Sequence, residues 1–322
     1  MGTALTGCAV PVIRTPKEEV AQFPLIDNHS HFLSKQQRSD IGTTPDELLK
    51  AMDAAGIRRM IVVGFGPEVP ELPKRYPGRF VASYIYNNFR SRQDIRLVGR
   101  IPERQRIVDG TSPREVEWIG GEFEEALKTG LYRALGEITT IANPIPASAL
   151  GGTTIPASGA NVSPDSPLVR RLIELAGKYD VPINIHCEDY ALQQMVHAVG
   201  AYPKTRVIWA HTGSYLSPSI IRGLLRDYPN LDFDLSAKNL LYRSPRSAQY
   251  SLLSSGVIDE SWRQLFEAHP DRFYFGVDFL TAEHLRLAAQ IGQYVQAILA
   301  QLTPPTARKI AYENAVRTYG LA

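Results

Sequence analysis

The feature that most constrains the fold is the alternation of short apolar runs, rich in β-branched residues, with helical patterns. Eight strand candidates lie at residues 24–32, 57–65, 79–86, 131–138, 181–186, 206–211, 231–236 and 272–278, and nearly all are followed by a helical pattern. Strands that alternate with helices form parallel sheets. Eight such units in about 300 residues predict an α/β fold, a single (β/α)₈ TIM barrel.

The competing fold is a doubly wound open sheet, but no Gly-rich phosphate loop follows the first strand. We expect a flexible N-terminal tail over 1–23 and one barrel domain over 24–322. Local signals mark the first helix, which has Thr44 as N-cap, Glu47 completing a capping box and Gly56 at its end. Two long connections, 87–129 and 140–166, leave the carboxyl ends of strands, where barrels carry their active sites.

Composition narrows the function classes. The formal net charge is +2, from 35 basic and 33 acidic residues, which argues against nucleic acid or a membrane surface as the main partner. No apolar run is long enough for a transmembrane segment. Two cysteines cannot build a disulfide framework or a Cys-rich zinc site. We therefore expect a small-molecule substrate, with a homo-oligomer left open.

The compartment has two interpretations. One is a cytoplasmic protein, in which the resemblance described next is a chance match. Residues 5–8, Leu-Thr-Gly-Cys, nevertheless resemble the lipobox of bacterial lipoproteins, which would make Cys8 a lipidated residue of a periplasmic lipoprotein. The basic and apolar regions that should precede a lipobox are absent.

Polar residues end several strand candidates in a pattern typical of metal sites. His29 and His31 are two apart, so both side chains face the same side of the first strand. Four further residues, Glu137, His186, His211 and Asp278, lie at or near the ends of the fourth, fifth, sixth and eighth strands. Buried charges at that density are costly without a cation. Nitrogen and oxygen donors of this kind suit Zn²⁺, with Mn²⁺, Fe²⁺ or Co²⁺ as alternatives, in one or two ions.

These segments carry a family resemblance. The motif "LIDNHSHF" resembles the first-strand motif of the amidohydrolase superfamily, and more narrowly of its amidohydrolase-related branch. The segments "INIHCED", "VIWAHTGS" and "FYFGVDF" resemble its fifth-, sixth- and eighth-strand motifs, and "IAYENAVRTYG" resembles a helix common near its C-terminus. The resemblance covers roughly residues 24–320.

The resemblance implies a role for each matched residue. His29, His31, His186 and Asp278 would be metal ligands, and Asp278 would also take a proton from the activated water. His211 would be a ligand of a second metal, or a base and polarising group near the substrate. A Lewis acid lowers the pKa of bound water to about 7, and a neighbouring carboxylate can accept its proton.

The chain departs from the closest pattern in two places. Many relatives have Pro soon after the eighth-strand Asp, where this chain has Phe279 and Leu280. Glu137 in "ALGEI" resembles a glutamate that bridges two metals in TatD-like hydrolases, whereas decarboxylases of the branch usually use one metal. Glu137 therefore favours hydrolysis, unless it is simply paired with Arg133 or another residue of the barrel interior.

Weaker candidates lie near the same mouth. Tyr84 and Tyr86 end the third strand on one face, and Lys238 follows the seventh strand, so we expect them to contact substrate. Asp27 would face inward with His29 if the first strand is regular, as an orienting partner of an imidazole or as a structural hydrogen-bonding group.

The sequence supports three hypotheses. The first is a metal-dependent hydrolase that uses an activated water on an ester, lactone or amide carbonyl, with Asp278 and His211 as catalytic residues. The second is a metal-dependent non-oxidative decarboxylase of an aromatic or unsaturated acid, with one metal and no need for Glu137. The third is a barrel that binds metal or ligand without catalysis.

Overall fold

The structure is a computed structural model that describes residues 23–36, 39, 42–64, 66–85, 110–142, 162–238 and 252–321. The strands of its main sheet are β1 (Leu25–Phe32), β2 (Ile57–Gly64), β3 (Phe80–Tyr84), β4 (Ala134–Ile141), β5 (Ile183–Cys187), β6 (Val207–Trp209), β7 (Leu231–Asp234) and β10 (Phe273–Tyr274). The helices are α1 (Pro45–Ala55), α2 (Leu72–Arg75), α5 (Pro113–Lys128), α6 (Pro167–Lys178), α7 (Leu192–Ala201), α8 (Pro218–Asp227), α10 (Glu260–Ala268), α11 (Ala282–Leu285), α12 (Ala288–Leu299), α13 (Pro304–Arg308) and α14 (Asn314–Tyr319).

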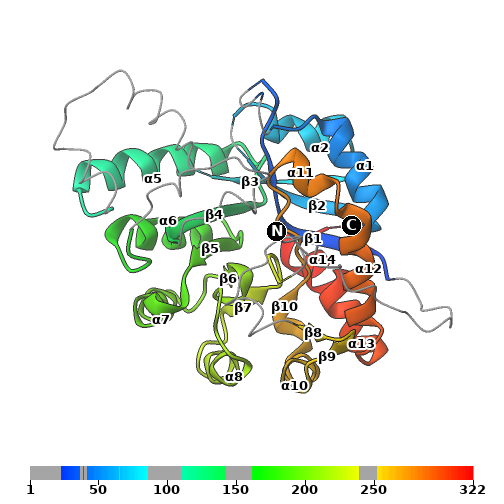
Figure 1. The fold of residues 1–322 in the computed structure, drawn as a ribbon. Coiled ribbons are helices and arrows are strands. Elements are labelled where there is room, and N and C mark those ends of the chain that lie inside the picture. The colour runs from blue at the N-terminus through cyan, green and yellow to red at the C-terminus, as the bar shows by residue number, and fades with distance from the viewer. Residues whose placement is uncertain are drawn as a thin grey trace, which may run out of the picture.

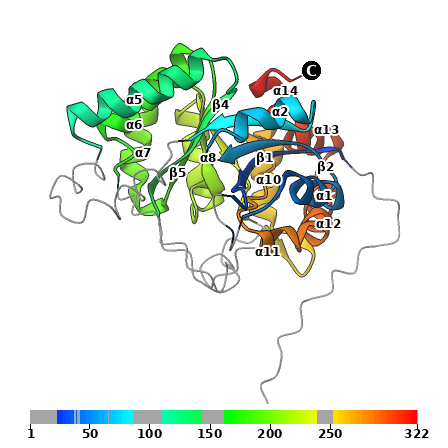
Figure 2. The same ribbon diagram turned by 90° about the horizontal axis from the view of Figure 1, so that it is seen from above.

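The strands form one curled parallel sheet. Its order is β1-β2-β3-β4-β5-β6-β7-β10, so each strand pairs with the next strand of this sheet in sequence order. Figure 1 shows most of the helices arranged around the outside of the curved sheet, and Figure 2 shows the same arrangement from above. The predicted alternation of parallel strands and helices is therefore confirmed, and the carboxyl ends of all eight strands face one side.

Several element boundaries differ from the prediction. The fourth strand runs over Ala134–Ile141 rather than 131–138, and the eighth shrinks to Phe273–Tyr274 within the predicted 272–278. A short antiparallel hairpin of β8 (Leu253–Ser254) and β9 (Val257–Ile258) was not predicted. The long helical patterns near the C-terminus are each divided, the last by a π-helical stretch over Lys309–Glu313.

Two clusters of buried apolar side chains pack against the sheet. The larger cluster lies between the outer face of the sheet and the helices. The smaller cluster gathers Ile26, Ile61, Val81, Ala134, Ile208, Tyr274, Ala315 and Tyr319. Three of its six strand residues, Ile26, Val81 and Ala134, lie in the amino-terminal halves of their strands, and its last two members belong to α14. This helix therefore plugs the amino-terminal end of the concave face and leaves the carboxyl end for polar side chains.

The first strand also contacts the segment that follows the last one. Asn28 N donates to the carbonyl of Phe275 at 2.9 Å, His31 N to that of Phe279 at 2.7 Å, and Asp278 N to that of His29 at 2.7 Å. Asp27 adds side-chain bonds at this seam, because its Oδ1 accepts from the amide of Val277 at 2.9 Å. These contacts place Asp278 beside the histidines of β1.

Local helix signals agree with the sequence. Thr44 Oγ1 accepts from Glu47 N at 3.2 Å while Glu47 Oε2 accepts from Thr44 N at 2.8 Å, which is the predicted capping box. Gly56 ends α1 with φ of 74°, a left-handed conformation that glycine adopts without strain. None of the helices in the described part of the chain has the length and apolar character needed to cross a membrane. Cys8 and the predicted tail fall outside the described residues, apart from residue 23.

Candidate metal centre

The structure brings six of the predicted side chains into one cluster at the carboxyl ends of the strands. The cluster consists of His29 and His31 of β1, Glu137 of β4, His186 of β5, His211 two residues after β6, and Asp278 four residues after β10. His29 is fully buried, and Glu137, His211 and Asp278 are each less than a tenth exposed. Residues far apart in the sequence thus meet in one polar centre enclosed by an apolar fold.

Glu137 lies in the middle of this cluster. Its Oε1 is 2.8 Å from His186 Nδ1 and 3.0 Å from His211 Nε2. Its Oε2 is 3.4 Å from His29 Nε2 and 3.3 Å from His31 Nε2. The two carboxylate oxygens therefore face two different pairs of imidazoles. Arg133, the alternative partner of Glu137, donates instead to the carbonyl of Tyr319 at 3.1 Å.

Two donor groups of the cluster could each hold a cation. In the first, His31 Nε2 is 3.2 Å and His29 Nε2 is 3.9 Å from Asp278 Oδ1. The second consists of Glu137, His186 and His211, with 3.0 Å between His211 Nε2 and His186 Nδ1. Within each group one donor atom per residue lies within 4.8 Å of the others. A third set combines His29 and His211 with Asp234.

The local backbone explains how these side chains reach the centre. Gly136 has φ of 101°, and a Cβ there would lie 2.1 Å from the carbonyl oxygen of Asn184 on the next strand. Only glycine therefore allows β4 to approach β5 closely just before Glu137. His211 and Asp278 have left-handed φ values of 56° and 67°. The surrounding hydrogen bonds hold this unfavourable conformation, as is common at functional sites.

The buried carboxylates of the centre favour positive charge on the groups around them. Burial alone would lower the pKa of His31, but Asp278 and Glu137 outweigh it and raise that pKa to about 9. The same balance, with Glu137 and Glu188 as partners, raises the pKa of His186 to about 10. Burial opposes ionisation of Glu137, yet the surrounding imidazoles hold its pKa well below the ordinary value. Protons on the imidazoles thus compensate the buried carboxylates, and a divalent cation would do the same.

The donor atoms fit a metal ion. His29 Nε2 and His186 Nε2 are buried and have no hydrogen-bond partner among the residues that the structure describes, although an unpaired buried nitrogen is costly. Both rings present these atoms to carboxylates, at 3.4 Å to Glu137 and 3.4 Å to Glu188 respectively. Imidazole nitrogens and carboxylate oxygens are the ligands that zinc and related divalent ions take in proteins.

The sequence interpretation missed the groups that support the cluster. Asp234, the last residue of β7, is fully buried, and its Oδ2 lies 3.1 Å from His29 Nδ1 and accepts from Asn184 Nδ2 at 2.7 Å. Glu188 is also buried and lies next to His186. A signal for Asp234 was present, because the polar residues of "LDFDLS" alternate toward one face of a strand.

The weaker candidates have varied positions. Tyr84 packs edge-on against Phe123 of α5, with ring centroids 4.9 Å apart. Lys238 Nζ donates to the carbonyl of Ser214 and lies 5.9 Å from the ring centroid of Trp262. Tyr86 lies outside the described residues. The substrate contacts of all three stay predictions.

Asp27 does not share the environment of the cluster. The register of β1 against β2 shifts between Asp27 and Ser30, so the regular alternation that would aim it at the same space as His29 is broken. Its carboxylate instead accepts hydrogen bonds from its own strand, from Ser30 Oγ at 2.5 Å and His29 N at 3.0 Å. This favours the structural role of the two that the sequence allowed.

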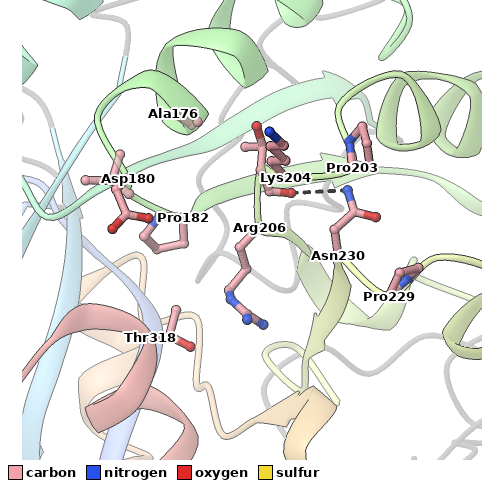
Figure 3. A pocket seen from close by; sticks show the side chains of 12 residues that line it. Ala176, Asp180, Pro182, Pro203, Lys204, Arg206, Pro229, Asn230 and Thr318 are labelled. Atoms are coloured by element: carbon pink, nitrogen blue, oxygen red, sulfur yellow. Dashed lines mark hydrogen bonds between the residues drawn. The ribbon is translucent and has the colours of Figure 1, made fainter.

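A cavity lies at the end of the sheet opposite the cluster. Figure 3 shows Asp180, Lys204, Arg206, Asn230 and Thr318 around a cavity of about 270 Å³. The first four come just before β5, β6 or β7, so the cavity opens at the amino-terminal ends of these strands. It is therefore separate from the polar cluster at their carboxyl ends.

Comparison with known proteins agrees with the architecture. A family model described as Amidohydrolase matches residues 149–321, which is more than half of the chain. A search of curated proteins found no match.

Solved structures share the fold along nearly the whole chain. An uncharacterised TIM-barrel protein from Bordetella bronchiseptica is 16% identical, with a TM-score of 0.58, covering 92% of this chain and 98% of that one. A probable 2-pyrone-4,6-dicarboxylic acid hydrolase from Acinetobacter baumannii is 13% identical, with a TM-score of 0.55 and coverage of 92% and 99%. A 2,6-dihydroxybenzoate decarboxylase from Rhizobium is 15% identical, with a TM-score of 0.53 and coverage of 93% and 99%. At these identities the similarity shows the fold alone.

Proposed function

The chain belongs to the amidohydrolase family of enzymes, and from this premise we propose that it is a metal-dependent hydrolase of an ester, lactone or amide bond in a small molecule. The observation that carries the proposal is the position of Glu137, whose two oxygens face different pairs of histidines. A carboxylate so placed is suited to bridge two cations. Two-cation sites are common among hydrolases, where they stabilise both the attacking and the leaving oxygen.

The six clustered residues would hold the ions. His29, His31 and Asp278 form one set, His186 and His211 form the other, and Glu137 belongs to both. When bound there, divalent cations, of which zinc fits the donors best, supply Lewis-acid chemistry that acidifies water and polarises a carbonyl.

The chain's own groups provide the rest of the reaction. Burial opposes ionisation of Asp278, but the nearby histidines keep its pKa below the ordinary value, so it is an ionised carboxylate able to accept a proton from the attacking water. His211 lies beside Glu137, and as a member of the second donor set its ring would help to hold the cation that polarises the carbonyl. We further propose that the seam between β1 and residues 275–279 closes the sheet into a complete barrel, which would keep Asp278 rigidly beside His29 and His31.

Replacement of Glu137 by Gln tests this function. The neutral amide keeps the shape but removes the shared charge, so we expect the bound metal per chain to fall and hydrolysis to drop by about 10²-fold or more. Metal content after dialysis and turnover on a panel of lactones, esters and amides would be measured together. Glu124→Gln on α5 serves as the control, because Glu124 lies outside the cluster and forms ion pairs with Arg171 and Lys178 of α6.

The same assay separates the competing reaction. The competing reaction is release of carbon dioxide from an aromatic or unsaturated acid, the type of reaction for which the similar decarboxylase from Rhizobium is named. One metal per chain, release of carbon dioxide by the wild type and full activity of Glu137→Gln would together contradict the hydrolase proposal in favour of decarboxylation.

A further inference from the structure

Asp234 is a buried carboxylate with an unusual number of donors. Its Oδ2 faces His29 Nδ1 at 3.1 Å and accepts from Asn184 Nδ2 at 2.7 Å. Its Oδ1 accepts from the backbone amide of His211 at 3.0 Å, from Ser236 N at 3.1 Å and from Ser236 Oγ. The side-chain amide of Asn184 and the two backbone amides can only donate, so both oxygens of Asp234 act as acceptors.

The tautomer of His29 follows from this contact. Because Asp234 Oδ2 can only accept, His29 Nδ1 must carry the hydrogen that joins them. The other ring nitrogen, Nε2, faces the carboxylates of Glu137 and Asp278, and it can offer a lone pair to a metal ion once its proton has left. A neutral imidazole in this form is the state that binds a metal ion through Nε2.

Ser236 extends the same logic to a second imidazole. Its hydroxyl has one hydrogen, which it donates to Asp234 Oδ1. The oxygen of Ser236 lies 2.8 Å from His211 Nδ1, so it must accept the hydrogen of that nitrogen. His211 Nε2 is then left to face Glu137 and His186.

We propose that Asp234 is a positioning residue that sets the tautomers of two proposed metal-binding histidines, acting on His29 directly and on His211 through Ser236. One carboxylate would thereby aim the Nε2 lone pairs of both rings into the centre. The inference rests on the proposed metal-dependent function. It predicts that Asp234 changes metal affinity without being a ligand itself, because such outer partners orient the rings that bind the ion.

Asp234→Asn is the discriminating variant. The amide nitrogen of Asn would face groups that must donate, so half of the acceptor capacity is lost while the shape is kept. Zn²⁺ affinity would be measured by competition with a chromophoric chelator, and ring tautomers by long-range ¹H–¹⁵N NMR of the zinc-loaded protein. We expect about 10- to 100-fold weaker zinc binding and loss of the Nδ1–H signature of His29.

Asp232→Asn is the matched control. Asp232 is equally buried on the same strand, but its partners are Arg206, Arg272 and Tyr274 at the amino-terminal end of the sheet. A merely structural loss should affect both variants, whereas the inference requires wild-type zinc affinity and histidine tautomers in Asp232→Asn.

The remaining outcomes are separable. Ser236→Ala should remove the Nδ1–H signature of His211 and weaken zinc binding, and it decides the matter if Asp234→Asn does not fold by near-ultraviolet circular dichroism. Wild-type zinc binding with unchanged affinity and tautomers in the folded variants would overturn the inference and leave the proposed function standing. A wild-type protein that binds no zinc would overturn the proposed function, and the inference with it.

Discussion

At the scale of single residues, burial decides how each charged side chain behaves. Glu137 and the histidines attract one another inside the cluster, so they keep their charges although burial opposes ionisation. Lys238 has a different environment. Its ammonium has the carbonyl of Ser214 and the ring of Trp262 beside it. Burial therefore lowers its pKa to about 8, although Glu188 and Asp189 oppose the change.

Lys238 should make stability depend on pH above neutrality. The unfolded chain restores the ordinary lysine pKa of 10.5, so between about pH 8 and that value the unfolded state binds more protons than the folded state. The free energy of unfolding contributed by this group therefore rises with pH across that window. Lys238→Met lacks this contribution. Urea unfolding at about pH 8 and about pH 10 should show the wild type gaining stability relative to the variant, and equal changes in both proteins would contradict the assignment.

At the scale of elements, local chemistry determines where α1 begins. The capping box of Thr44 and Glu47 satisfies amide groups that the first helical turn leaves unpaired. Thr44→Ala removes the side-chain acceptor and should lower the free energy of unfolding by about 1 kcal/mol. Thr44→Ser keeps the hydroxyl and should stay close to the wild type. Chemical denaturation of the three proteins measures the difference, and equal loss in both variants would show that packing of the threonine methyl group matters instead.

The difference between local and long-range contacts explains which features the sequence could predict. The helix start at Thr44 and the stop at Gly56 depend on neighbours within a few residues, so they could be predicted without the fold. The cluster of six candidate metal ligands could be predicted because its members lie at or near the ends of apolar strands. The register shift of β1 between Asp27 and Ser30 depends on pairing with distant segments, as does the position of Asp234 against His29. No short window of sequence contains those partners, so these features became visible only in the structure.

At the scale of the whole molecule, the C-terminal helix α14 packs against the first strand, β1, on the concave face of the sheet. Tyr319 of α14 is buried with Ile26 and other apolar residues of the concave face, and its hydroxyl donates to Asn28 Oδ1 at 2.6 Å. Asn314, the first residue of α14, donates to the carbonyls of Pro270 and Phe273 at 2.8 Å each. The C-terminal motif "NAVRTYG" thus ties the last helix to both the first and the last strand of the sheet, at the end opposite the cluster of six candidate metal ligands.

Tyr319→Phe tests how much this closure contributes to the fold. The ring still fills the apolar space, but Asn28 loses the donor to its Oδ1, and its Nδ2 already lacks a hydrogen-bond partner within the described part of the chain. An unsatisfied buried amide costs about 1–3 kcal/mol, so we expect a loss of that size in the free energy of unfolding. Tyr312→Phe, at a partly buried tyrosine in the π-helical stretch just before α14, is the control. Equal stability of the two variants would mean that apolar packing alone holds α14 in place. A selective loss in Tyr319→Phe would instead show that one polar contact joins the end of the chain to its first strand, because the two substitutions remove the same atom.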